Sequence, residues 1–283
     1  MAHIERFAPS PTGYLHLGHA FSALTAWDHA KAEGGTFLLR IEDNDHTRVR
    51  PEFEQAIYDD LHWLGLDWPK PVLRQSDNMK AYQTALYLLS ALGLTYACEC
   101  TRSDIKKAQP LPIYGPDGQV YPGTCRNKKL TNTKNTAIRL NMAKAIAHLG
   151  GGDHVNLLSF TDINDGRNEH SLNADQLLSK CGDIVLARRD IGTAYHLAVV
   201  VDDAAQNITH VTRGQDLFEA TQIHRILQVL LGLPTPIYRH HRLIVDENGK
   251  RLAKRDNSRA IRKYREGGAS PQDICEMVGL GNG

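Results

Sequence analysis

The sequence lacks the long apolar segments that membrane-spanning helices need. No run of hydrophobic residues in the 283-residue chain approaches the roughly 20 that cross a bilayer. The first ten residues, Met1 to Ser10, also lack the basic start and apolar block of an export signal. We therefore expect a soluble, cytoplasmic protein with no membrane partner.

Cysteine is scarce, and the five thiols are an odd number. Without an export signal, this argues for reduced cysteines rather than a disulfide framework and leaves metal binding open. Net charge is almost absent at +1, so composition alone does not indicate a nucleic-acid partner. The 41% hydrophobic and 23% charged residues are ordinary for a globular protein and exclude disorder as the main state.

The charge is unevenly distributed along the chain. Between Tyr238 and Arg265, ten basic residues face three acidic ones, a local charge of +7 that leaves −6 for the rest. Such a basic end suits a polyanionic ligand, although a solvated basic surface is an equally simple interpretation.

The first forty residues predict the start of an open α/β sheet. Residues 4–8 and 36–41 read as strands, and residues 20–32 between them have helical spacing that ends at Gly34 and Gly35. Ligands of such sheets bind beyond the carboxyl ends of the strands. The loop at residues 9–19 and the acidic segment at residues 42–45 should both lie there.

Periodicity predicts further elements, interrupted by a segment of different texture. From Tyr96 to Leu130, prolines, glycines and three cysteines replace helical spacing and mark an insertion. We expect helices at residues 51–64, 77–92, 218–231 and 271–278, and strands at residues 137–140, 184–187 and 198–201.

Two segments carry the features of phosphate-binding chemistry. His16-Leu17-Gly18-His19 places two histidines about a glycine at a predicted helix start, where backbone N–H groups and the helix dipole favour phosphate oxygens. Far downstream, the segment from Lys250 to Arg255 lies on a predicted loop, from which a lysine can reach a triphosphate. Alone, the first would be a capped helix start and the second a basic surface patch.

Together these segments resemble the "HIGH" and "KMSKS" motifs of class I aminoacyl-tRNA synthetases. The stretch from Arg6 to Gly13, the segment from Arg40 to Asp43, residues 195–203, and Arg213-Gly214 are similar to the glutamyl-tRNA synthetase catalytic domain over residues 3–260. The resemblance implies a Rossmann-like parallel sheet split by an inserted subdomain. We divide the chain into two halves of the catalytic domain (1–95 and 183–235), an insertion (96–182), and a KMSKS-like loop with a helical piece (236–283).

The resemblance also implies a role for particular residues. Glutamate would be bound through its carboxylates by Arg6 and Arg213 and through its ammonium group by Glu42, with Ala8, Ser10 and Tyr195 completing the glutamate site. ATP, with Mg²⁺, would be bound by His16, Gly18, His19 and Lys254, and the catalytic residues would be His16, His19 and Lys254. Asp202 and Asp203 are expected to be structural, as caps of the following segment.

A structural zinc ion, one per chain, is implied for the insertion. Cys98, Cys100, Tyr121 and Cys125 match the family's zinc position, and thiolates are suitable ligands for tetrahedral Zn²⁺. Tyrosine is an uncommon ligand, so Tyr114 or a water could take the fourth place. Alternatively, the three thiols are small buried hydrophobic groups. Cys181 and Cys275 fit no cluster.

The acceptor of the activated glutamate is the least determined feature. The chain ends at Gly283, before any large helical anticodon-binding region, so we expect that region to be missing. This shortness, with the cysteine pattern, is similar to the glutamyl-Q tRNA(Asp) synthetases, and implies queuosine in the anticodon stem-loop of tRNA(Asp) as acceptor. The alternatives are a truncated synthetase that charges the 3′ end of tRNA(Glu) and a non-catalytic tRNA-binding paralogue.

Overall fold

The computed structural model describes residues 2–128, 130, 135–245 and 260–281, and these form two compact units. The first unit comprises Met1–Asp77, Asn207–Gln215 and Tyr238–Gly283. The second unit comprises Asn78–Gln206 and Asp216–Ile237. Chain segments distant in sequence therefore meet within each unit.

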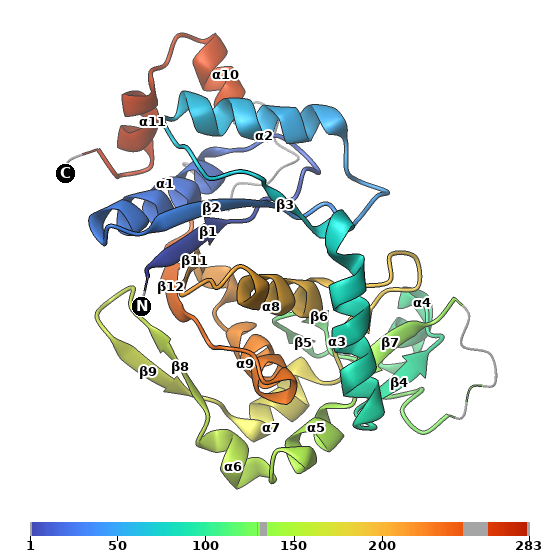
Figure 1. Cartoon of the computed structure of the whole chain (residues 1–283). Helices are drawn as coiled ribbons and strands as arrows, with labels where there is room; N and C mark the ends of the chain where they lie inside the picture. The colour runs from blue at the N-terminus through green and yellow to red at the C-terminus, as the bar shows by residue number, and fades with distance from the viewer. Residues whose placement is uncertain (1, 129, 131–134, 246–259, 282–283) are drawn as a thin grey trace. The chain divides into compact units, whose positions relative to one another are not determined.

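A largely parallel sheet forms the first unit, as the α/β prediction requires (Figure 1). Strand β1 pairs in parallel with β2 on one side and β11 on the other, and β2 pairs in parallel with β3. The order is β3, β2, β1, β11, β12, with bounds Leu73–Arg74, Thr36–Ile41, Ile4–Phe7, His210–Gly214 and Ile237–His241.

Helix α1 (Leu17–Ala32) contributes the main apolar layer of the first unit. Four of its buried residues are alanines, and small side chains allow a helix to approach a sheet closely. The helix begins three residues before the predicted start because His16 caps it. Helices α2 (Pro51–Trp63), α10 (Ile261–Glu266) and α11 (Pro271–Met277) also contribute side chains to this core.

The second unit contains a small antiparallel sheet, a hairpin and several helices. The small sheet has the order β10 (Val185–Ala187), β7 (Ala137–Leu140), β4 (Thr95–Cys98). The hairpin is β8 (Ser159–Asp162) with β9 (Asn168–Ser171), and a two-residue pair forms β5 (Tyr114–Gly115) and β6 (Gly118–Gln119). The helices are α3 (Met79–Ala91), α4 (Arg102–Ala108), α5 (Met142–His148), α6 (Gly152–Asn156), α7 (Ala174–Gln176), α8 (Tyr195–Ala205) and α9 (Thr221–Leu231).

The strand expected at residues 198–201 is wrong, because these residues lie within helix α8. The three consecutive valines at 199–201 favour a strand, but the helix is buried on nearly all sides, so its apolar residues show no helical period.

Asp202 is structural, as expected. Its carboxylate accepts hydrogen bonds from Tyr82 Oη at 2.8 Å and Asn78 Nδ2 at 2.7 Å, which tie α8 to α3.

The other predicted helices and strands are present, with ends shifted by up to a few residues. Among the described residues, no helix combines the length and the apolar character needed to cross a bilayer.

Candidate active site and metal centre

Three buried arginines share one face of the parallel sheet in the first unit. They are Arg6 on β1, Arg40 on β2 and Arg213 on β11, with side chains 5%, 0% and 6% exposed. The register pairs Glu5 with His210 and Arg6 with Leu38. Because side chains alternate along a strand and paired residues share a face, the three guanidinium groups lie opposite the face of Glu5.

One buried carboxylate belongs to the same face. Glu42 directly follows β2, and its Oε1 atom lies 3.4 Å from Nη2 of Arg40. Its backbone N–H donates to the carbonyl of Pro9 at 3.1 Å, which joins the end of β2 to the loop after β1. Ala8 and Ser10 lie half-buried in that loop. The excess of guanidinium groups over carboxylates suits a ligand with more than one anionic group.

His240 orients one of these arginines, a contact that sequence reasoning missed. Nε of Arg213 donates to Nε2 of His240 at 3.1 Å, and the guanidinium lies 5.1 Å from the ring centre of Tyr238. Both partners come from β12, next to β11 in the sheet. Arg213 and His240 lie on neighbouring strands but are too distant in sequence for any motif to relate them.

His16 and His19 form a reciprocal cap at the start of α1. Nδ1 of His16 accepts the backbone N–H of Gly18, and Nδ1 of His19 accepts that of His16, both at 3.1 Å. A nitrogen that accepts a hydrogen bond carries no proton, so each neutral ring has its proton on Nε2. The two rings, 3.8 Å apart, therefore each present an N–H donor at a helix N-terminus.

The KMSKS-like segment, including Lys250 and Lys254, lies outside the described residues, but the residues on either side of it contact the same turn. Ala260 forms a β-bridge with His16, and Ile261 N–H donates to the Leu15 carbonyl at 2.8 Å. On the other side, Ile244 belongs to the same apolar core as Leu15. A Cβ added at Gly18 would meet Ile244 at 4.0 Å.

Asp43 and Tyr195, two further residues from the family motifs, lie in different surroundings. Asp43 accepts hydrogen bonds from Arg74 Nη2 at 2.9 Å and from the backbone N–H and hydroxyl of Ser76 at 2.8 and 2.6 Å, so its carboxylate holds the chain after β3. Tyr195 belongs to the second unit, where it is the first residue of α8 and lies half-buried beside the ring of His196.

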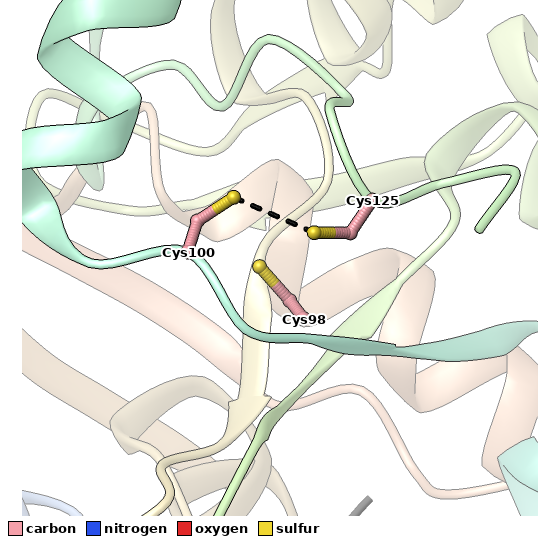
Figure 2. A group of neighbouring side chains, drawn as sticks. All are labelled: Cys98, Cys100 and Cys125. Carbon is pink, nitrogen blue, oxygen red and sulfur yellow. Dashed lines mark hydrogen bonds between the residues drawn. The ribbon is translucent and has the colours of Figure 1, made fainter. Parts of the chain in front are cut away.

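The cysteines of the insertion form the cluster that the sequence suggested. The sulfur atoms of Cys98, Cys100 and Cys125 lie within 4.8 Å of one another and point toward a common centre, with Cys100 and Cys125 3.4 Å apart (Figure 2). Cys98 and Cys125 are buried. Three thiols held at this spacing fit a tetrahedral metal ion.

Tyr121, rather than Tyr114, lies beside the three thiols. Its hydroxyl oxygen is 3.4 Å from Cys98 Sγ and 3.3 Å from Cys100 Sγ, and it accepts the backbone N–H of Cys125 at 2.8 Å. Tyr114 is 67% exposed. Cys181 and Cys275 lie outside the metal-ligand clusters formed by the described residues, as expected.

The thiols differ in acidity. Burial raises the pKa of Cys100 to about 11. Burial acts in the same direction on Cys125, but hydrogen bonds from Tyr121, the backbone at Glu99 and the other two thiols outweigh it and lower the pKa of Cys125. Cys125 is therefore more readily ionised than Cys100, and an ionised sulfur is the form that binds a metal.

The described part of the basic segment is partly neutralised. Arg262 and Lys263 lie 3.2 and 2.6 Å from carboxylate oxygens of Glu266, and Arg265 lies 3.5 Å from Asp60. Glu266 and Asp60 fall outside the segment whose charge was counted. The local charge is thus smaller than the sequence count of +7 suggests.

Comparison with known proteins identifies the family. The model for "tRNA synthetases class I (E and Q), catalytic domain" matches residues 4–281. The chain belongs to this family. Glutamyl-Q tRNA(Asp) synthetase of Rhodobacter capsulatus is 53% identical over 286 residues, which cover 98% of this chain and all of that protein. The enzyme of the same name from Nocardia farcinica is 41% identical over 273 residues, or 96% and 82% of the two chains.

The solved structures of the class I family agree with the fold. Glutamate-tRNA synthetase from Elizabethkingia anophelis is similar with a TM-score of 0.76 and 26% identity. The match covers 99% of this chain and 61% of that one. The Rossmann-like class I synthetase fold expected from the sequence is therefore confirmed.

Proposed function

We propose that this class I synthetase activates L-glutamate with ATP and transfers it to queuosine in the anticodon stem-loop of tRNA(Asp). The observation that carries the activation step is the sheet face with Arg6, Arg40, Arg213 and Glu42. The acceptor rests on similarity, at 53% identity over nearly the whole chain, to a relative named for that reaction.

The sheet face has the charges that glutamate needs. Glutamate carries two carboxylates and one ammonium group, so a binding site must present more cationic than anionic groups. Arg6 and Arg213 are rigid guanidinium forks that can each bind a carboxylate through two N–H donors. Glu42, aligned by Arg40, would accept the ammonium group. Ala8 and Ser10 would complete the part of the glutamate site that the first unit forms.

The capped turn of α1 suits the ATP phosphates. The Nε2–H groups of His16 and His19 are hydrogen-bond donors for phosphate oxygens, and Gly18 lets the backbone approach a phosphate closely. Lys254 precedes Ala260, the partner of His16, by six residues, which can span at most about 20 Å. Lys254 would therefore be able to reach the same phosphates, and Mg²⁺ would enter with ATP.

The proposed chemistry has two steps. An oxygen of the glutamate α-carboxylate attacks the α-phosphorus of ATP, the bond to the bridging oxygen breaks, and pyrophosphate leaves. A hydroxyl of the queuosine ring then attacks the carbonyl carbon of the adenylate, loses its proton, and AMP leaves. The protein contributes positioning and charge stabilisation by His16, His19 and Lys254, with no covalent intermediate on a side chain.

The cysteine cluster would bind a structural zinc ion. Cys98, Cys100 and Cys125 would be its ligands, with Tyr121 as the nearest fourth group. Bound zinc would hold β4 and the loop at Cys125 together. The hydroxyl of Tyr121 stays protonated without metal, because burial and hydrogen bonds to the thiols raise its pKa.

The test uses labelled glutamate, ATP and three RNAs: tRNA(Asp) with queuosine, the same tRNA without it, and an isolated queuosine-containing anticodon stem-loop that has no acceptor end. We expect labelling of the first and third RNAs only. Equal labelling of the tRNA without queuosine would exclude the modified base as acceptor.

A second candidate function is charging of the 3′ end of tRNA(Glu). It is favoured by the similarity to glutamate-tRNA synthetase from Elizabethkingia anophelis. This alternative predicts labelling of tRNA(Glu) that is abolished when its terminal adenosine lacks both ribose hydroxyls, and no labelling of the isolated stem-loop.

A further inference from the structure

A second group of metal-ligating side chains lies in the first unit, on the sheet face opposite the arginines. It consists of His3, which directly precedes β1, Glu5 on β1, and His29 in the last turn of α1. The chain segment with Ser10, His16 and His19 leaves the carboxyl end of β1, whereas His3 and Glu5 lie at its amino end. The group is therefore separate from the proposed catalytic residues.

The three candidate ligand atoms lie close together. Nε2 of His3, Oε1 of Glu5 and Nδ1 of His29 all lie within 4.8 Å of one another. His3 Nε2 is 3.0 Å from Glu5 Oε1, and His29 Nδ1 contacts the same oxygen. Ligand atoms bonded to a tetrahedral zinc ion at about 2.0–2.1 Å are about 3.3 Å apart. The distance of 3.0 Å between His3 Nε2 and Glu5 Oε1 is close to that value.

The group is held in place by contacts outside it. The second oxygen of Glu5 accepts the hydroxyl of Thr212 on β11 at 2.7 Å, the kind of contact that orients a ligating carboxylate. The carbonyl of His3 accepts the backbone N–H of Thr36 at 2.8 Å. Glu5 is fully buried, and the side chains of His3 and His29 are 10% and 17% exposed, so solvent reaches only the imidazole side.

We propose that His3, Glu5 and His29 form a second binding site for a divalent transition-metal ion, with Zn²⁺ as the ion of choice and a water as fourth ligand. Two imidazoles and one carboxylate are ligands that Zn²⁺ accepts, and four-coordination fits a site with so little solvent access. The ion would join β1 to α1 on the side of the sheet remote from the arginines. Its role is structural.

A hydrogen-bonded network without metal is the rival arrangement. In it, both histidines donate to one oxygen of the buried Glu5 carboxylate. The two arrangements differ in metal content and in the atoms around the metal, and these quantities decide between them without reference to activity.

The experiment measures zinc per chain after equilibrium dialysis of the full chain against Zn²⁺, with X-ray absorption to count sulfur ligands. We expect two ions in the wild type, with about 1.5 sulfur ligands per zinc on average, because three thiols serve two ions. His29→Gln and His3→Gln should each bind one ion with about three sulfur ligands. Cys125→Ser should retain the ion at His3, Glu5 and His29, bound without sulfur.

His210→Gln is the matched control. The ring of His210 stacks on that of His3 at 3.9 Å but lies outside the ligand group, so this variant should still bind two ions. Having two independent histidine variants keeps the test valid if one of them misfolds. One zinc per chain in the wild type with about three sulfur ligands, or two in both His3→Gln and His29→Gln, would overturn the proposal.

Discussion

Asp60→Asn should stabilise the protein at neutral pH, since it removes a buried charge. Asp60 lies on α2 with no exposed side-chain surface, and its closest cationic partner among the described ion pairs, Arg265 on α10, is 3.5 Å away. Burial, opposed by the charges of Arg265 and Arg262, raises the pKa of Asp60 from 3.8 to about 6. The folded protein therefore binds this proton more tightly than the unfolded chain.

The sign and size of the effect on stability follow from the difference between the folded and unfolded pKa of Asp60. With a folded pKa above the unfolded one, the contribution of Asp60 to stability is fully present below pH 3.8 and is lost as pH rises through about 6. The loss is about 1.5 kcal/mol at pH 5 and about 3 kcal/mol at pH 7. The pKa of about 6 already includes the attraction of Arg265 and Arg262, so the expected gain from Asp60→Asn at pH 7 is about 3 kcal/mol.

Urea unfolding of both proteins at pH 5, 6 and 7 measures this gain. The difference in unfolding free energy between variant and wild type should grow by about 1 kcal/mol or more from pH 5 to pH 7. Glu52→Gln removes an exposed carboxylate from the first turn of the same helix, one that is not among the charges acting on Asp60, and should leave the pH dependence unchanged. A difference that does not vary with pH, or a variant less stable than the wild type at pH 7, would refute the reasoning.

Two further predictions concern the motifs. Lys254→Ala should slow glutamate-dependent pyrophosphate exchange by at least about 100-fold, the effect of losing one contact to transition-state charge, whereas Lys263→Ala on α10 should not; equal rates for the two variants would remove Lys254 from the mechanism. Cys125→Ser should lower the melting temperature and the sulfur-bound zinc while Cys275→Ser does neither, and unchanged sulfur-bound zinc in Cys125→Ser would show that Cys125 is no ligand.

Local patterns predicted the fold where a segment has one buried face. The strand Thr36–Ile41 has the predicted ends, and the helix that starts at Pro51 ends one residue before its predicted end. The strand prediction for residues 198–201 failed because a helix that is buried all round has no amphipathic period. The β-branched composition therefore dominated the prediction.

Some residues of the site could likewise be predicted from local sequence, and others could not. His16 and His19 are close in sequence, so their shared turn could be predicted, and the cysteines were linked by the resemblance to the family's zinc position. The roles of Arg40 and His240 became visible only in the structure, where Arg40 contacts Glu42 just beyond its own strand and His240 contacts Arg213 from the adjacent strand. His3 and Glu5 lie in one segment, but His29 lies in helix α1, and no local pattern joins it to them.

The choice of amino acid tests the central claim most directly. Pyrophosphate exchange into ATP, without RNA, should depend on glutamate and proceed at least about 100-fold less efficiently with glutamine, because the amide would leave a buried guanidinium without its anion. Aspartate, one methylene shorter, should also fail. Arg213→Gln should lose most of the preference for glutamate over glutamine. Comparable exchange with glutamate and glutamine in the wild type would contradict the assignment of Arg6 and Arg213 to the substrate carboxylates.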